Sequence, residues 1–193
     1  MLNKIFSLII CAFILILSCL EGYNIIDTKN IKNKNEDNII AYYQENKSFE
    51  EKENHYEYLG ILNIKDIKLN RGFYSKESPL NDLSKNIYYL KESIPLEEKN
   101  SMIILAAHRG TSKISFFNNL DKLKIGSEIE LNYKGENYKY ILSFKYNELK
   151  DGRLSIYRDK NKDSLILITC NKFDKKRQTI YVSYRREEVK WLL

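Results

Sequence analysis

Hydrophobic and polar residues are distributed very differently in three parts of the chain. Residues 5–20 form an unbroken apolar run, IFSLIICAFILILSCL, and Lys4 is the only charged residue before it. At about 1.5 Å per residue such a helix is roughly 24 Å long, and the flanking residues bring it close to the thickness of a bilayer core. This pattern predicts a single-pass membrane anchor over residues 1–22, with the N-terminus in the cytoplasm and the rest of the chain outside the cell.

Two other interpretations of the apolar run stay open. A cleaved signal peptide is one of them, but no small-x-small cleavage site follows the run. The other is a lipoprotein signal that ends at Cys19, because residues 16–19 read Ile-Leu-Ser-Cys and loosely resemble a lipidation motif. The uncleaved anchor is the interpretation that we favour.

The next stretch, residues 23–57, is rich in asparagine, lysine and glutamate. Only the segment near residues 39–43 has weak helical periodicity. We expect a solvated stalk with a short helix, which holds the following domain away from the membrane.

From Tyr58 onward, short β-like runs alternate with turn signals. Some runs alternate strictly, whereas residues 102–107 are continuously apolar and predict a central strand. Seven or eight such strands favour a mainly β fold over residues 58–193, a closed β-barrel, because closure removes exposed strand edges. The sequence KGEN at residues 134–137 predicts a hairpin turn, and short helices are expected at residues 79–83 and 115–123. The predicted strands are residues 58–64, 67–74, 102–108, 128–133, 138–146, 164–170 and 179–184.

Composition narrows the possible functions. The 193 residues are 43% hydrophobic and 30% charged, which suits one folded domain with a short appendage. The net charge of +6 comes from scattered lysines and no compact basic run, so we expect no nucleic-acid partner. There is no HExxH motif, CxxC pair or glycine-rich phosphate loop, and we expect no metal or other cofactor.

Three residues at predicted strand ends could carry chemistry. Cys11 and Cys19 lie in the apolar run, which leaves Cys170 as the only thiol in the exported part. His108 and Cys170 each follow a buried strand, so adjacent strands would bring them to the same rim, and Arg177 opens the last strand. A thiol beside a histidine can become the attacking thiolate, and a guanidinium can hydrogen-bond the oxyanion of acyl transfer.

The other candidates have weaker support. Arg185 and Arg186 could replace Arg177, but they lie farther along the last strand. His55 belongs to the polar stalk. Three carboxylates near the loop before Cys170 could bind calcium: Glu148, Asp159 and Asp163. Lysines lie between them in the sequence, so a solvated acidic loop is favoured over a calcium site.

Four local motifs resemble the sortase family of surface transpeptidases. They are GILNI at residues 60–64, LAAH at 105–108, FFNNLDKLKIG at 116–126 and LITC at 167–170. The resemblance extends from Tyr58 to Tyr184 in the family's order. It departs from the TLxTC signature at Ile166, which stands in place of threonine, and at Ala107, where glycine often precedes the histidine. Neither departure removes a reacting group.

The resemblance implies a sortase β-barrel and a two-step reaction. Cys170 would attack an LPxTG-like sorting signal of a surface protein and form a thioester. His108 would act as acid and base, and Arg177 would bind the oxyanion. The acyl group would pass to an amine of peptidoglycan or a pilin. Only 17 residues separate Tyr146 from Ser164, too few for the helical insertion of a typical class B sortase.

Two alternatives to a sortase remain at this point. The first is an exported cysteine peptidase that releases its product to water. The second is a non-catalytic exported β-barrel that binds a ligand and keeps Cys170 only as a core thiol.

Overall fold

The structure, a computed structural model, describes residues 26–27, 29–42 and 58–186. Its contacts divide the chain into two units, residues 1–37 and 38–193. Residues 26–27 and 29–42 are helical, so the helix is longer than the one predicted near residues 39–43. Lys32 and Glu36 lie four residues apart on it, with their charged atoms 3.7 Å apart, a spacing that supports helices modestly.

The predicted anchor over residues 1–22 lies outside the described residues, as does His55. Within residues 26–27, 29–42 and 58–186, no helix combines the length and the hydrophobicity that crossing a bilayer requires. The anchor therefore stays a prediction.

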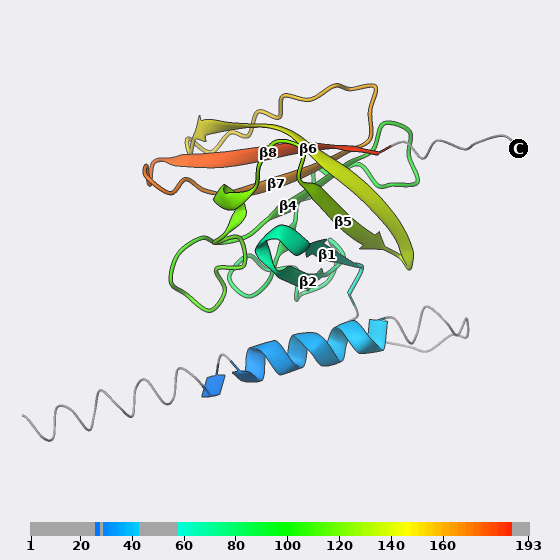
Figure 1. Ribbon diagram of the computed structural model, residues 1–193, viewed down its shortest axis with the longest axis vertical. Helices are drawn as coiled ribbons and strands as arrows, with labels where there is room; N and C mark the ends of the chain where they lie inside the picture. Colours follow the sequence, from blue (N-terminus) through cyan, green and yellow to red (C-terminus); the bar gives the residue numbers. More distant parts are fainter. Residues whose placement is uncertain (1–25, 28, 43–57, 187–193) are drawn as a thin grey trace, which may run out of the picture. The chain divides into compact units, whose positions relative to one another are not determined.

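Eight strands form one sheet in the order β2-β1-β5-β6-β8-β7-β4-β3 (Figure 1). All named neighbours are antiparallel except β4 and β7, which run parallel. The strands are β1 Gly60–Ile64, β2 Leu69–Phe73, β3 Tyr88–Tyr89, β4 Met102–Ala106, β5 Glu128–Tyr133, β6 Glu136–Leu149, β7 Ser164–Cys170 and β8 Arg177–Arg185.

The sheet curls into a nearly closed barrel. A bridge between Phe73, the last residue of β2, and Ile87, the residue before β3, joins the two ends of the sheet. Between β5 and β6 the chain turns at Lys134 and Gly135, whose φ angles of 50° and 83° are both positive. Two positive φ angles are typical of the hairpin turn whose twist matches the strands. The predicted mainly β barrel and this hairpin turn are confirmed.

Each strand near the barrel's middle has an inner and an outer apolar face. On β7, Leu165 and Leu167 belong to the inner core, whereas Ile166 and Ile168 belong to a second cluster on the outer face. Both sets are almost fully buried. A strand with two buried faces reads as a continuous apolar run, which explains why residues 102–107 and 165–168 show no alternation.

The connection between β6 and β7, residues 150–163, covers the outer face. Leu154 and Ile156 pack on the outer cluster. The hydroxyl of Tyr146 donates to the carbonyl oxygen of Ser155 at 2.7 Å and accepts from the backbone N–H of Tyr157 at 3.0 Å. This connection therefore packs against the outer face of the barrel, and it contains no helix.

Of the two predicted short helices, the one at residues 79–83 is wrong, and the one at residues 115–123 is limited to a short 3-10 helix. Residues 79–83 form turns, because Ser78 and Asp82 accept hydrogen bonds from the backbone N–H groups two residues ahead. Such local side-chain bonds compete with helix formation. In residues 115–123, only Leu120–Lys122 forms a single 3-10 turn, η2.

Candidate active site

The parallel pairing of β4 with β7 brings His108 and Cys170 together. Residue 102 pairs with 164, and each following pair keeps the offset of 62 as far as Ala106 and Ile168. The pairing continues beyond β4, since the N–H of Ala107 donates to the carbonyl oxygen of Ile168 at 3.2 Å. One further step places His108 beside Cys170. Neighbouring strands lie about 4.8 Å apart, so the two residues share one rim.

Strand alternation assigns Cys170, and by extension His108, to the outer face of the barrel. Every second residue of a strand lies on one face, and the outer cluster contains Ala106 on β4 and Ile168 on β7. His108 and Cys170 each follow by two residues, so they continue this face. Both are half-buried, which lets them react while part of each remains packed.

Neighbouring contacts fix the backbone at both residues. The hydroxyl of Thr169 donates to the carbonyl oxygen of Ala107 at 2.9 Å, and the N–H of Phe117 donates to the carbonyl oxygen of His108 at 3.1 Å. The Phe117 ring is fully buried in the inner core. The FFNNLDKLKIG motif thus supports the histidine through Phe117.

Asp121 of η2 ties the loop after His108 to the loop after Cys170. Its carboxylate lies 2.8 Å from a guanidinium nitrogen of Arg109 and 3.0 Å from the ammonium of Lys172. Burial opposes ionisation of Asp121, but the hydrogen bonds from Lys172 and Arg109 outweigh it and hold its pKa below the ordinary value. The sequence contained no signal for these ion pairs, although Asp121 lies in the motif at residues 116–126.

Lys150 of the β6–β7 connection contacts the thiol. Its ammonium donates a hydrogen bond to Cys170 Sγ at 3.1 Å. The N–H of Lys150 donates to the carbonyl oxygen of Lys176 at 2.9 Å, which extends the pairing of β6 with β8. Sequence spacing gave no signal for Lys150, because only this pairing brings it beside Cys170.

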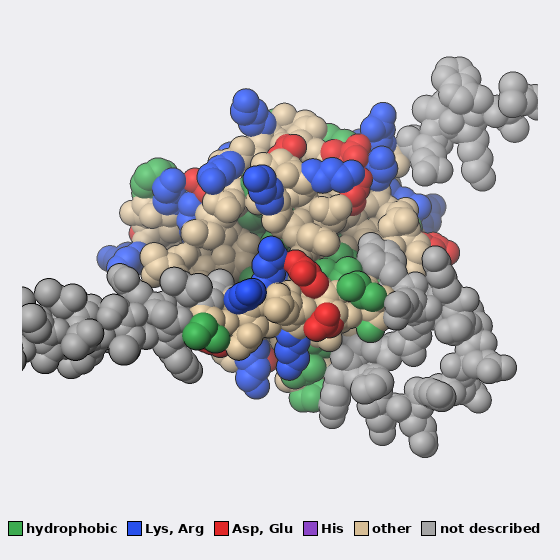
Figure 2. All heavy atoms as spheres, turned by 60° about the horizontal axis from the view of Figure 1, so that its bottom comes forward, with side chains coloured by type: hydrophobic (Ala, Val, Ile, Leu, Met, Phe, Trp, Pro, Cys, Tyr) green, Lys and Arg blue, Asp and Glu red, His purple; other side chains and the backbone are tan. Residues whose placement is uncertain are grey.

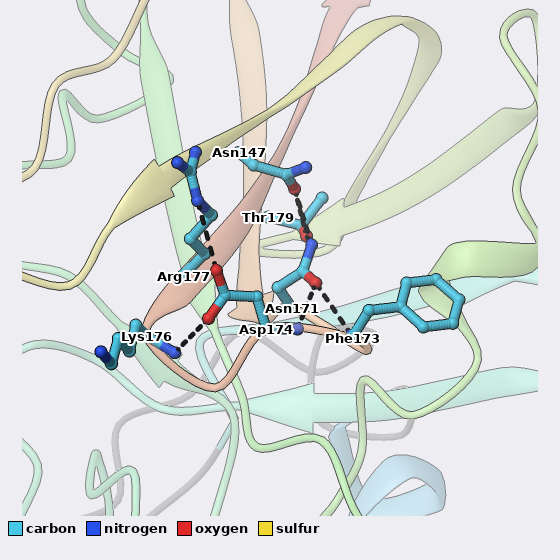
Figure 3. A network of polar contacts seen from close by, with 7 residues as sticks. All are labelled: Asn147, Asn171, Phe173, Asp174, Lys176, Arg177 and Thr179. Atoms are coloured by element: carbon cyan, nitrogen blue, oxygen red, sulfur yellow. Dashed lines mark hydrogen bonds and ion pairs between the residues drawn. The ribbon is translucent and has the colours of Figure 1, made fainter.

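Arg177 begins β8, as predicted, but it is not the register partner of Cys170. That partner is Gln178. The Arg177 guanidinium lies 3.4 Å from Asp174 in the β7–β8 turn, and its side chain is 45% exposed (Figure 3). The structure therefore brings His108 and Cys170 to one face and places Arg177 at the neighbouring strand's start.

A polar network around Asn171 closes the β7–β8 turn. The amide of Asn171 donates to Asn147 at 2.9 Å and to the hydroxyl of Thr179 at 3.0 Å (Figure 3). The Asn171 side-chain oxygen also accepts from the N–H groups of Phe173 and Asp174. These bonds fix the short turn that follows the thiol.

The alternative arginines lie at the opposite end of β8. Arg185 contacts Asp163, and Arg186 contacts Glu128, each at 3.3 Å. The partner of Tyr184 is Ser164, the first residue of β7, whereas Cys170 is the last. At about 3.3 Å per residue, six steps separate these ends by roughly 20 Å.

The carboxylates considered for calcium each have protein partners. Asp159 lies 3.7 Å from Lys162, Asp163 contacts Arg185, and Glu148 accepts from the N–H of Ser155. Within the described part of the chain, no three His, Cys, Asp or Glu side chains gather as metal ligands. On the face in Figure 2, lysines and arginines stand among acidic and apolar side chains.

The sortase-domain family model matches residues 62–186, about two thirds of the chain. The chain belongs to the sortase family. This sortase is a cysteine transpeptidase by family. No curated protein matches the sequence closely enough to count as a relative.

Solved sortase structures of several classes share its fold. Sortase A from Corynebacterium diphtheriae, a lid mutant, has a TM-score of 0.61 at 21% identity and covers 70% of this chain and 74% of its own. A Clostridium perfringens sortase D5 transpeptidase has a TM-score of 0.61 at 19% identity, covering 81% and 98%. Sortase C1 from Streptococcus agalactiae has a TM-score of 0.58 at 24% identity, covering 68% of each chain. At these identities the likeness establishes the sortase fold.

Proposed function

We propose that this sortase cleaves an LPxTG-like sorting signal with Cys170 as nucleophile and His108 as the acid and base. The observation that supports the proposal is the parallel register of β4 and β7, which ends two residues before His108 and Cys170. A thiol next to an imidazole is the arrangement that activates cysteine nucleophiles.

In the first step the Cys170 thiolate attacks the carbonyl carbon of the scissile peptide bond, and the carbonyl oxygen becomes an oxyanion. The C–N bond then breaks, and the leaving amine takes a proton from the His108 imidazolium. The product is a thioester on Cys170. The predicted role of Arg177 is to donate hydrogen bonds to this oxyanion.

In the second step an amine of a peptidoglycan cross-bridge or of a pilin lysine attacks the thioester. His108, now neutral, takes up the proton of the incoming amine, and the thiolate of Cys170 leaves. One amide bond is exchanged for another through an activated acyl group, so the reaction needs no nucleotide hydrolysis.

The anchor over residues 1–22 and the stalk over residues 23–57 would hold the catalytic domain, residues 58–193, outside the cell membrane. The apolar run at residues 5–20 supports this placement. The short, helix-free connection over residues 150–163 argues against a typical class B enzyme. Anchoring of surface proteins is therefore favoured over haem-protein anchoring or pilus assembly.

The decisive experiment traps the thioester. The protein is incubated with a library of sorting-signal peptides, and acylated Cys170 is identified by mass spectrometry, which tests the chemistry and reads the preferred motif together. Adding an amine should then convert the intermediate to an amide product. Release of free acid alone, with and without the amine, would indicate a cysteine peptidase.

A second measurement separates the enzyme from a non-catalytic binding module. Iodoacetamide should alkylate Cys170 in the native protein, because the residue is half-buried at a strand end. A thiol that reacts only after unfolding would contradict a catalytic role.

A further inference from the structure

An amine side chain lies directly beside the sulfur that the proposed reaction acylates. The Lys150 ammonium donates a hydrogen bond to Cys170 Sγ at 3.1 Å. Its backbone is fixed by the hydrogen bond from the Lys150 N–H to the carbonyl oxygen of Lys176 at 2.9 Å. The Lys150 side chain is exposed to solvent. The contact therefore joins a solvent-accessible primary amine to the reacting atom of the enzyme.

The strand registers agree with this contact. Cys170 pairs with Gln178 across β7 and β8, and Gln178 pairs with Glu148 across β8 and β6. Lys150 lies two residues beyond Glu148, and alternation along a strand returns it to the same face. In the order β6-β8-β7-β4, Lys150 approaches the thiol from the β6 side, whereas His108 follows β4 on the other side of β7.

The second step of the proposed reaction is the attack of an amine on a thioester, and Lys150 carries the same functional group as the external acceptor. In the thioester the acyl carbon is bonded to Cys170 Sγ, so an amine in contact with Sγ is also next to that carbon. Reacting atoms about 3–3.5 Å apart are the geometry from which such an attack begins.

We propose that Lys150 is an internal acyl acceptor: when no external amine is available, the acyl group passes from Cys170 to the Lys150 amine and forms an isopeptide bond within the enzyme. The proposal rests on the thioester proposed above. It makes Lys150 a modification site, and the group that modifies it is the new carboxyl end of the cleaved sorting signal.

The bonds and protons of this transfer balance without a further reactant. The Lys150 ammonium loses one proton to solvent, and the neutral amine attacks the carbonyl carbon of the thioester. The C–N bond forms and the C–S bond breaks, so Cys170 leaves as a thiolate. The neutral His108 imidazole takes up the second proton of the nitrogen, as it does for an external amine.

Two opposing effects set the rate of the transfer. A lysine amine attacks only in its neutral form, which is about one part in 10³ of an ordinary lysine at pH 7. Rigidly oriented partners react as if one of them were present at about 10⁵ M or more, but the exposed, four-carbon stem of Lys150 loses much of this advantage. The transfer should therefore be slow compared with turnover and faster than at lysines farther from the thiol.

Two other lysines give an internal comparison. Lys160 belongs to the same β6–β7 connection as Lys150 and is likewise exposed. Lys172 follows Cys170 by two residues, but its ammonium lies 3.0 Å from the carboxylate of Asp121. If contact with the sulfur decides which amine is acylated, the label belongs on Lys150.

The test incubates the enzyme with the peptide that acylates it best, in a buffer that contains no primary amine. Neutral hydroxylamine then cleaves thioesters and leaves amides intact. Trypsin does not cut after an acylated lysine, so the segment YNELKDGR at residues 146–153 stays whole and carries the mass of the acyl group. The hydroxylamine-resistant label on this segment should exceed that on Lys160 or Lys172 by at least about tenfold. An added external amine should suppress it.

Three variants sharpen the result. Lys150→Arg keeps a cation at this position and removes the nucleophilic amine, so its label should stay sensitive to hydroxylamine. Lys160→Arg is the matched control and should keep the resistant label on Lys150. Isotopically labelled Cys170→Ala, mixed with the wild type, should stay unlabelled, because an internal transfer does not reach a second molecule.

A wild-type label that hydroxylamine removes completely would overturn the inference, as would equal resistant labels on Lys150 and Lys160. In either case the thioester would still support the proposed reaction. If neither a thioester nor an amide forms with any peptide, the proposed reaction fails and the inference fails with it. The wild-type label is located by mass, so the outcome does not depend on the folding of a variant.

Discussion

The two ends of the β7–β8 pair contain similar charged residues but use them differently. At the end with Ser164, Asp163 accepts from the N–H of Ser101 at 2.8 Å and contacts Arg185 at 3.3 Å. Ser101 is fully buried. At the end with Cys170, the Lys150 ammonium is hydrogen-bonded to the thiol.

This difference separates a charge that satisfies a buried backbone group from a charge that contacts the thiol. A carboxylate that satisfies a buried N–H and an arginine at once contributes to stability, because removing it leaves a buried donor without its acceptor. A cation at a reactive sulfur stabilises no such buried partner. Substitutions at one end should change unfolding, and substitutions at the other should change catalysis.

The largest effect is expected for Cys170→Ala. No second thiol lies in the predicted exported part, so thioester formation should be undetectable, at least about 10³-fold below the wild type. The variant removes one sulfur atom at a half-buried strand end, and its thermal unfolding midpoint should be unchanged. Residual transpeptidation above a tenth of the wild-type rate would exclude Cys170 as the nucleophile.

The next largest effect is expected for His108→Ala, with a loss of about 10²–10⁴-fold in both acylation and transfer to the amine. Loss of the imidazole removes the proton donor for the leaving amine and the acceptor for the incoming one. Rapid-quench kinetics on a single turnover measures the acylation step by itself. Normal acylation in that experiment would contradict the general-acid role.

At the structural end, Asp163→Ala should lower the free energy of unfolding by about 1–3 kcal/mol, because the buried N–H of Ser101 loses its acceptor. Thioester formation per folded molecule should not change. Asp159→Ala is the matched control, since this carboxylate is exposed and lies 3.7 Å from Lys162. The control should stay within about 0.5 kcal/mol of the wild type. Equal effects of the two substitutions would show that the Ser101 contact contributes nothing.

The smallest effect is expected for Asp121, which lies between the loops that follow His108 and Cys170. Its pKa is lowered in the folded state, so its stabilisation is present above the unfolded value of about 3.9 and is lost as the pH falls through the folded pKa. Asp121→Asn should therefore cost about 1 kcal/mol at pH 7 and almost nothing below pH 3. Denaturant unfolding at the two pH values measures the difference, and a loss of equal size at both would rule out the ionic contribution.

Strand pattern and strand ends could be predicted from the sequence. The predicted strands at residues 128–133 and 164–170 coincide with β5 and β7, because their apolar runs are bounded by clear turn residues. Strand β3 has only two residues, Tyr88 and Tyr89, too few to form a recognisable pattern. His108 and Cys170 could be singled out because each stands at the end of a buried apolar run, and their catalytic roles stay predictions.

The position of Lys150 beside the thiol could not be predicted, because it depends on a register shift. On β6, the pairing with β8 shifts by one residue between Leu142 and Phe144. A one-residue slip moves every following side chain to the other face of a strand. Without the shift, Lys150 would project from the face opposite Cys170. Nothing in the local sequence signals this bulge.

The parallel pairing of β4 with β7 also has a consequence for folding. Its partners are 62 residues apart, and pairings between such distant segments form late, because the loop entropy is lost before the contacts are gained. The strands β5 and β6 can form their hairpin locally, whereas the pair that joins the histidine to the cysteine needs β7 in place. The thiol and the imidazole therefore meet only when the barrel is nearly complete. A chain that has been exported but has not yet paired β4 with β7 would therefore be inactive.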